Sequence, residues 1–436
     1  MSDVTQAFHR SQMIPAREPP RSQRGAWKWM HENLFSSIGN GVITVVTIAI
    51  VLYIVTLSLP WFLHSVWNAK SLTECRTIIH ATWGENAGGA CWAVIHQNWN
   101  LYVFGFYPIA QYWRPTLAFV LLLVALMPIL FSHMPRKMIW FSAVYPALAY
   151  WLIWGGTFWI AVTIMLGFVA GWLALRVATR LANAPLGVAA AVLAAVLWWL
   201  FAAGPVASGL QHLVPIRLPF VASDKLGGFL LAFIVGMCAI GFSLPMGILL
   251  SLGRRSDMPL IKTTSVVFIE FIRGVPLITL LFTASFLLAY FLPPGTTFDL
   301  VLRVIIMVTL FSAAYIAEVI RGGLAAIPRG QFEAADALGL TYWQAQRLII
   351  MPQALKISIP GIVSTFIGLF KDTTLVIIVG LLDPLMGITN AVRASTLWNG
   401  IYWEPYIFSG VIFFIFCFGM SRYSMYLEGK LKTDHR

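Results

Sequence analysis

Four consecutive polar residues, Lys371, Asp372, Thr373 and Thr374, interrupt an otherwise apolar stretch over residues 361–381. Lys371 follows Gly361 by ten residues, which places it about 15 Å along a helix that rises about 1.5 Å per residue. A charge at mid-membrane costs roughly 2.5–3.5 kcal/mol on insertion scales, so such residues usually face a cavity or a partner. A zwitterion would suit the pair, its ammonium facing Asp372 and its carboxylate facing Lys371. A purely structural pairing, with Glu318 as one partner, is the other interpretation.

Two further pairs of opposite charge have helical spacing. Glu270 and Arg273 lie in the segment E-F-I-R-G-V-P, and Glu318 and Arg321 precede two glycines. Residues three apart on a helix are neighbours, so each pair is expected to form an ion pair. The first pair is predicted to be structural and near a gate, or else to touch a substrate. Its helix is predicted over residues 263–292, with a kink allowed by Gly274 and Pro276. Glycines 322 and 323 are expected to hinge the chain.

A polar segment between two apolar stretches reads E-A-A-D-A-L-G-L-T-Y-W-Q-A-Q-R-L-I-I-M-P and covers residues 333–352. Its first residues are good helix formers, and Gly339 tolerates positive φ. A second short helix over residues 342–350 is expected to end before Pro352. Glu333 at the start of the first helix would suit the helix dipole. The resulting helix–turn–helix knob would fit a groove of a soluble partner, although an ordinary interfacial loop helix has the same composition.

The composition predicts an all-α polytopic membrane protein that positions these groups. Hydrophobic residues make up 59 %, charged residues 11 %, and the mean hydropathy is +0.80. Apolar runs near the length of a membrane span recur along the chain, without the alternation of a β-barrel. About ten transmembrane helices are expected. They cover residues 38–60, 116–132, 138–155, 157–175, 186–204, 227–252, 263–292, 301–321, 361–381 and 405–421.

The distribution of positive charge sets the predicted orientation. If both termini are cytoplasmic, the cytoplasmic segments hold 20 of the 29 Lys and Arg residues, in agreement with the positive-inside rule. The segment 333–352 then lies in the cytoplasm. The net charge of +12 therefore reflects topology rather than nucleic-acid binding. The chain has no P-loop, no Ser-His-Asp or metalloprotease signature and no spacing typical of a metal site, so it is expected to be a non-enzyme without a cofactor.

Four regions follow from this map. Residues 1–37 are a basic cytoplasmic tail without a cleavable signal peptide, which leaves a membrane-surface or partner contact open. Residues 38–204 are an accessory five-helix region, a scaffold or a packing surface for a partner. Residues 205–226 are an outward linker, and residues 227–436 form a second five-helix unit. The outward loop 61–115 contains Cys75 and Cys91, for which a disulfide in an oxidising compartment is expected over free thiols.

The segment 333–352 resembles the cytoplasmic EAA loop of the permease subunits of bacterial ABC importers. That pattern is E-A-A, three residues, G, nine residues and I-x-L-P. Six residues of this chain fall on it, with Met351 in place of Leu: Glu333, Ala334, Ala335, Gly339, Ile349 and Pro352. The segment from Glu270 to Pro276 resembles a signature of the polar amino-acid branch. The run from Lys371 is similar to K-D-T-S-L, with Thr374 in place of Ser. The outward loop Tyr107–Pro115 and the closing Ser421–Ser424 also resemble a subunit of the general L-amino-acid importer.

This resemblance implies a C-terminal five-helix permease domain in the bacterial inner membrane. It implies four kinds of partner: ATPase subunits that use ATP and Mg²⁺ and grip the EAA loop, a second and different permease, a periplasmic binding protein, and an L-amino acid. The lipid bilayer surrounds the complex, and nucleic acid has no part in it. The main alternative is an ion-coupled secondary amino-acid transporter, and a scaffold or membrane enzyme is another. Amino-acid preference, export and the role of residues 38–204 stay open.

Overall fold

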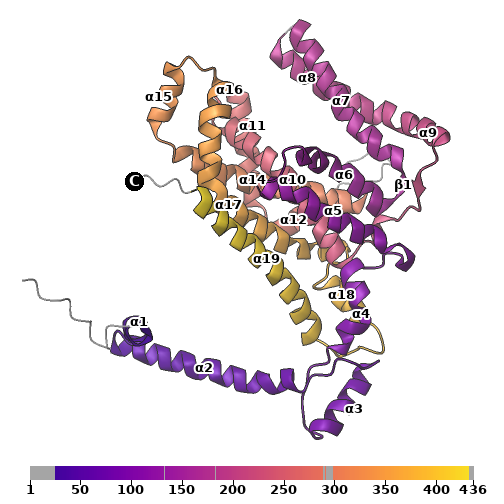
Figure 1. Ribbon diagram of the computed structural model, residues 1–436, viewed down its shortest axis with the longest axis vertical. Helices are drawn as coiled ribbons and strands as arrows, with labels where there is room; N and C mark the ends of the chain where they lie inside the picture. Colours follow the sequence, from indigo (N-terminus) through magenta and orange to yellow (C-terminus); the bar gives the residue numbers. More distant parts are fainter. Residues whose placement is uncertain (1–24, 132, 182, 288–289, 291–297, 432–436) are drawn as a thin grey trace, which may run out of the picture. The chain divides into compact units, whose positions relative to one another are not determined.

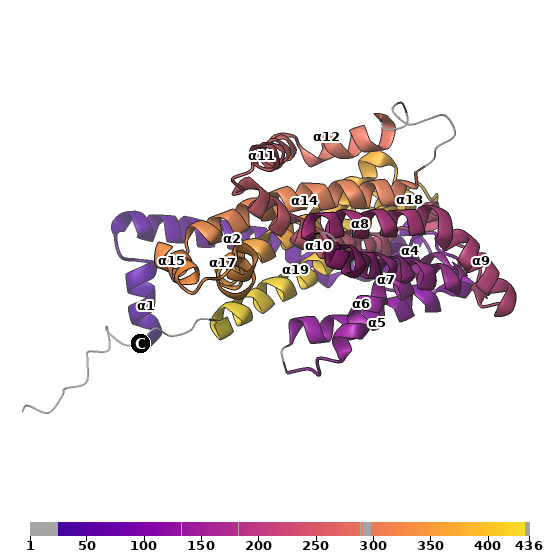
Figure 2. The same cartoon turned by 90° about the horizontal axis from the view of Figure 1, so that it is seen from above.

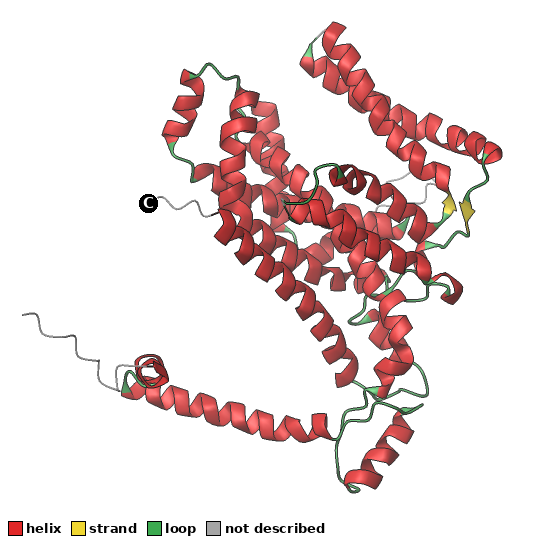
Figure 3. Cartoon of the chain, viewed as in Figure 1, coloured by secondary structure: helices red, strands yellow, loops and turns green. Residues whose placement is uncertain are grey.

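The computed structural model describes the chain except for residues 1–24, 132, 182, 288–289, 291–297 and 432–436. Almost all of the described chain is helical, with two short strands (Figure 3). The fold divides into two compact units, which are considered separately. The first contains residues up to Ala69 together with Thr73–Trp92, and the second contains Lys70–Leu72 together with Ala93–Arg436.

The first unit consists of one long apolar helix and an element closed by a disulfide. Helix α1 covers Gly25–Asn33, α2 covers Ile38–Leu63, and α3 covers Leu72–Trp83. The side chain of Ser37 caps α2 by accepting from the backbone N–H of Asn40, as Ser commonly does at a helix start. No residue of α2 is buried, as expected for a helix whose surroundings are lipid.

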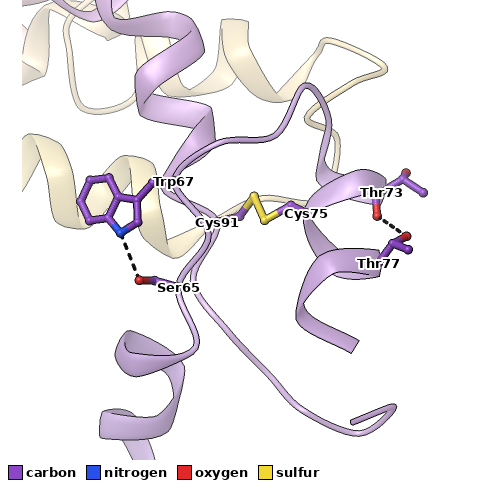
Figure 4. The surroundings of a disulfide bond; sticks show 6 residues. All are labelled: Ser65, Trp67, Thr73, Cys75, Thr77 and Cys91. Atoms are coloured by element: carbon purple, nitrogen blue, oxygen red, sulfur yellow. Dashed lines mark hydrogen bonds between the residues drawn. A yellow bond between two sulfur atoms is a disulfide. The ribbon is translucent and has the colours of Figure 1, made fainter. Parts of the chain in front are cut away.

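Cys75 on α3 is joined to Cys91 by a disulfide (Figure 4). Both cysteines are buried, and the backbone N–H of Val66 donates to the carbonyl of Ala90 beside them. Trp67 stacks on Trp92, with the ring centroids 5.7 Å apart. The bond therefore fixes a small folded element in the loop that the sequence places outside the membrane. The free cysteines, Cys238 and Cys417, lie on membrane helices of the second unit.

The second unit is a bundle of long helices joined by short connections (Figures 1 and 2). Its first half contains α4 (Ala93–Phe104), η2 (Ile109–Gln111), α5 (Trp113–Leu130), α6 (Met138–Trp154), β1 (Gly156–Thr157), α7 (Phe158–Leu181), α8 (Ala184–Leu197), η3 (Trp198–Ala202), α9 (Ala203–Leu213), β2 (Arg217–Leu218) and η4 (Ser223–Lys225). Its second half contains α10 (Gly228–Arg254), α11 (Pro259–Gly274), α12 (Leu277–Phe282), η5 (Thr283–Leu287), α14 (Leu300–Ala325), α15 (Arg329–Ala337), α16 (Tyr342–Ala345), η6 (Gln346–Ile350), α17 (Met351–Asp372), η7 (Thr373–Val379), α18 (Gly387–Arg393) and α19 (Trp403–Leu431).

Helices α10, α14 and α17 pack closely because glycines face their neighbours. A Cβ added at Gly247 would lie 2.6 Å from Ile316, and one added at Gly361 would lie 2.6 Å from Val319. Small residues at membrane-helix interfaces let backbones approach in this way. The main buried cluster also includes Ala118 of α5 and Leu152 of α6. Helices α5 and α6 therefore share a core with the C-terminal helices, although both lie within residues 38–204.

The buried guanidinium of Arg114 fastens this shared core at the start of α5. Its side chain donates to the backbone carbonyls of Leu152 (2.6 Å) and Pro219 (2.9 Å) and to the amide oxygen of Gln111. The residue is only 1 % exposed. Nearby, β1 pairs with β2 in an antiparallel register, Gly156 opposite Leu218. Residues 205–226, which were predicted to be a linker, thus contain most of helix α9 and the strand β2, which pairs with β1.

Each of the ten predicted spans overlaps an apolar helix, with local differences. Among the described residues, eight helices are long and apolar enough to cross a membrane, and a bent pair makes a ninth. Met138–Trp154 is a further, shorter apolar helix. The helix predicted over residues 263–292, with a kink allowed at Gly274 and Pro276, is broken there, since α11 and the α12–η5 segment meet at 103°. Residues 288–289 and 291–292 of this range lie outside the described part of the chain. Val275 is extended because Pro276 disfavours the helical conformation in the residue that precedes it.

Pro205, the first residue of the predicted linker, and Pro352, before which a helix was expected to end, both lie within helices. Pro205 lies within the span Leu186–Leu213, and Pro352 lies within the span Tyr342–Val379. Each follows a wide turn, η3 and η6 respectively, whose last bond runs five residues back, from Ala203 to Trp198 and from Met351 to Gln346. A π-turn shifts the bonding pattern by one residue, and we infer that this shift accommodates the missing proline N–H.

Candidate functional site

The segment 333–352 forms a helix–turn–helix knob at one end of α17 (Figure 1). Helix α15 ends at Ala337, and Gly339 has φ +68°, a conformation that glycine adopts without strain. Its N–H donates to the carbonyl of Asp336 at 2.9 Å. Thr341 and Gln344 then form a reciprocal capping box at the start of α16, which satisfies free backbone donors. The turn is therefore specified locally.

The knob begins earlier and continues further than predicted. Helix α15 starts at Arg329 and has no acidic residue in its first turn, so Glu333 lies in the middle of the helix, exposed and away from the helix dipole. Ala334 is exposed and Ala335 is buried. The second helix does not stop before Pro352, because α16, η6 and α17 follow one another directly. Residues 342–352 are thus one end of a 38-residue helix, Tyr342–Val379, that is long and apolar enough to cross a membrane.

Several contacts hold the knob to the bundle. Ile350 is fully buried in a core cluster, against which Phe332 and Ile349 pack. The guanidinium of Arg255 lies 5.5 Å from the ring centroid of Phe332. The amide of Gln353 on α17 donates to Gln331 on α15 at 3.0 Å. These contacts connect the knob to the ends of α10 and α17.

The outer surface of the knob carries large apolar side chains that sequence reasoning did not single out. Their exposed fractions are 73 % for Leu338, 53 % for Tyr342, 67 % for Trp343 and 64 % for Leu348. Exposed aromatic anchors are typical of protein interfaces. The signal was present in the sequence, since the tyrosine and tryptophan stand in a segment otherwise rich in polar residues.

An ion cluster joins three helices, α10, α11 and α14. Glu318 on α14 pairs with Arg254 of α10 at 2.8 Å, with Arg273 of α11 at 3.5 Å and with Arg321 at 3.0 Å. Glu270 pairs with Arg254 at 2.8 Å. The predicted pair Glu318–Arg321 is present. Glu270 and Arg273 do not pair with each other, because their side chains reach different helices.

The polar quartet lies where the helix changes its geometry. Lys371 and Asp372 end α17, and Thr373 begins η7, a 3₁₀ segment of seven residues. Runs of 3₁₀ helix beyond about four residues are uncommon and often mark a functional hinge. Lys371 is exposed, Asp372 is partly buried, and Thr373 is 1 % exposed.

The threonine hydroxyls of the quartet are used locally. Thr373 donates to the carbonyl of Phe370 at 2.7 Å, and Thr374 donates to the carbonyl of Lys371 at 2.9 Å. In the part of the chain that the structure describes, no ion pair involves Lys371 or Asp372, and the carboxylate of Glu318 is occupied by arginines. The structural pairing with Glu318 that the sequence left open is therefore not formed.

Glycines 322 and 323 have different surroundings, and neither breaks the helix. Helix α14 continues through both to Ala325, so the expected hinge is not formed. A Cβ added at Gly323 would lie 2.1 Å from Ser358 Oγ and 2.6 Å from the carbonyl of Ala354, whereas one added at Gly322 would meet nothing within 4 Å. Gly323 therefore permits the crossing of α14 and α17.

Comparison with known proteins gives consistent matches. The family described as "Binding-protein-dependent transport system inner membrane component" matches residues 243–433. The glutamate/glutamine/aspartate/asparagine transport system permease protein BztC of Rhodobacter capsulatus is 61 % identical over the full length of both chains. The inner membrane amino-acid ABC transporter permease protein YhdY of Escherichia coli is 37 % identical over 96 % of each chain. A crystal structure of an amino acid ABC transporter is 30 % identical, covers 46 % of this chain and 90 % of its own, and has a TM-score of 0.41.

Proposed function

The chain belongs to the permease subunits of amino-acid ABC transporters, and on this premise we propose that it carries L-amino acids from the periplasm to the cytoplasm. It is a multi-pass protein of the inner membrane. The observation that carries the proposed coupling is the knob α15–α16, a rigid turn with exposed Tyr342 and Trp343 that is continuous with a membrane helix. ATP and Mg²⁺ are used by a separate ATPase, for which this knob is the docking element.

The proposed substrates are acidic amino acids and their amides. BztC, 61 % identical along the whole chain, is named as a transporter of glutamate, glutamine, aspartate and asparagine. This name supports the proposed substrate class. The polar residues Lys371 to Thr374 support the proposed position of the binding site within the membrane span. Lys371 and Asp372 offer opposite charges at the start of a 3₁₀ segment, so a zwitterion would meet one group of each sign. We assign the carboxylate of the substrate to Lys371 and its ammonium to Asp372.

The proposed complex contains two different permease chains, two ATPases and a periplasmic binding protein. The second permease would cover the exposed side of Lys371, because a charged group within a span avoids lipid. In this arrangement both termini are cytoplasmic, as the distribution of Lys and Arg predicts. The binding protein delivers the amino acid to the outward side, and closure of the ATPases moves the knobs.

Gentle purification from the native membrane tests the assembly first. A P-loop ATPase and a second permease should accompany the chain. The purified complex in proteoliposomes should take up glutamate only with ATP inside the compartment that corresponds to the cytoplasm. Uptake by the isolated chain, driven by an ion gradient without ATP, would overturn the proposal in favour of a secondary transporter.

Substitutions at the quartet test the pathway. Lys371→Ala and Asp372→Ala should each lower glutamate uptake by roughly tenfold or more, the loss of a charge-assisted contact. Ser364→Ala on α17 is the matched control, since that exposed side chain lies outside the quartet. Full uptake by both quartet variants would remove these residues from the substrate pathway while leaving the transport function in place.

A further inference from the structure

One carboxylate holds arginines that come from three different helices. Arg254 is the last residue of α10, Arg273 lies at the end of α11, and Arg321 lies one turn after Glu318 on α14. Their distances to the Glu318 carboxylate are 2.8, 3.5 and 3.0 Å. The Glu318 side chain is 15 % exposed, against 53 % for Glu270. Solvent and salt screen such a partly buried group less than an exposed one.

Glu318 lies on a continuous path from the knob to the broken span. Helix α14 continues from Glu318 to Ala325, and the knob begins at Arg329. On its other side Glu318 reaches Arg273, which comes two residues before the extended Val275 and the 103° bend. Figure 2 shows α11 and α12 on the same side of α14.

Beyond the bend, the path continues to the polar quartet. Leu277 and Leu281 of α12 share a buried cluster with Val376 of η7, and η7 directly follows Asp372. Each step is a packed helix, an ion pair or a shared core. Coupling between distant sites is carried by connected elements of this kind when they have two arrangements, and a bend between two half-helices provides such an element.

We propose that Glu318 is the positioning residue that transmits movement of the knob to the broken span, through its bond to Arg273. This inference rests on the proposed transport function and adds the residue on which coupling depends. Arg254 also binds Glu270 on α11, so α11 keeps its link to α10 when Glu318 is neutralised. Neutralisation therefore removes the ion pair between α11 and α14, while the contact of Arg273 with the Tyr315 ring remains. It also leaves the arginines near one another without their shared counter-ion.

The test is the number of glutamate molecules transported per ATP hydrolysed, in proteoliposomes that contain the complete complex and the binding protein. Glu318→Gln preserves shape and removes the charge. We expect it to assemble and hydrolyse ATP while this ratio falls roughly tenfold, within the range of measured allosteric couplings. Glu270→Gln is the matched control, because it removes the same charge from a more exposed site, and it should keep the ratio within about twofold.

Arg273→Gln is the second variant, needed if Glu318→Gln does not assemble. It leaves Glu318 paired with Arg254 and Arg321 and breaks only the link to α11. It should lower the ratio as Glu318→Gln does, and Glu318→Asp should restore part of it. A normal ratio in Arg273→Gln, or equal losses in Glu318→Gln and Glu270→Gln, would overturn the inference. Failure of the unmodified complex to couple uptake to ATP would instead overturn the proposed function.

Discussion

Glu270 and Arg273 lie one helical turn apart on α11, yet each is paired with a residue of another helix: Glu270 with Arg254, and Arg273 with Glu318. The spacing that favours an internal pair is used here to join α11 to two neighbours at once. This arrangement holds α11, the first half of the broken span, against α10 and α14. The sequence showed that these two charged residues lie on one face of a helix. Tertiary packing decided which residues they pair with.

Replacing Gly323 with Ala should weaken the crossing of α14 and α17. The added Cβ would come within 2.1 Å of Ser358 Oγ and 2.6 Å of the carbonyl of Ala354, and overpacking of this kind typically costs about 1–3 kcal/mol. Thermal unfolding in detergent measures the loss. Gly322→Ala is the control, since its Cβ would meet nothing within 4 Å, and it should be neutral or slightly stabilising. Equal effects of the two changes would contradict the packing described here.

Replacing Gly339 with Ala should loosen the turn of the knob. A residue with a Cβ at φ +68° pays roughly 1–2 kcal/mol for the left-handed conformation. Hydrogen exchange in residues 329–345 should become faster while the membrane helices keep their protection. Gly330→Ala, with no contact within 4 Å and no positive φ, should leave exchange unchanged or slow it. Faster exchange in both variants would show that the conformation at Gly339 is not the cause.

Replacing Trp343 with Ala should weaken binding of the ATPase. The side chain is 67 % exposed on the knob, and a buried aromatic anchor at an interface is worth about 2 kcal/mol, or roughly 30-fold in affinity. Titration of the purified ATPase onto the permease pair measures this loss. Trp140→Ala provides the control, because that side chain is 78 % exposed on α6, away from the knob. Unchanged ATPase affinity would exclude Trp343 from the docking surface.

Replacing Arg114 with Gln should destabilise the core shared by α5, α6 and the later helices. The guanidinium satisfies carbonyls of Leu152 and Pro219, and each buried acceptor left without a donor costs about 1–3 kcal/mol. A lower unfolding temperature is expected. Arg217→Gln, at an exposed position of β2, should have little effect. A neutral result for Arg114→Gln would mean that other donors replace it.

Removing the disulfide should open the outward element of the first unit. Cys75 and Cys91 are separated by 16 residues, and closing loops of this order typically stabilises a fold by about 2–4 kcal/mol. The double variant Cys75→Ala/Cys91→Ala should therefore be cleaved faster by protease that is added to the purified protein in detergent. Cys238→Ala, which removes a free thiol, should be cleaved at the original rate. Equal protection would show that the element is held by its other contacts.

The sequence alone determined the membrane class, the approximate spans and the identity of the knob. Hydrophobic runs must be helical in lipid because backbone groups there need internal partners. The turn at Gly339 was also predictable, because glycine has no Cβ and adopts positive φ without strain. The pair Glu318–Arg321 formed as predicted because both residues lie on one face of one helix.

Only the tertiary structure decided the remaining features. The sequence did not predict the 103° bend between α11 and the α12–η5 segment, the π-turns that precede Pro205 and Pro352, or the sharing of Glu318 among three arginines. The contacts of Glu318 with Arg254 and Arg273 join residues far apart in the chain, and single-sequence periodicity carries no information about which residues meet. Gly322 and Gly323 show this directly: they are identical in type and adjacent in sequence, but only one of them faces another backbone.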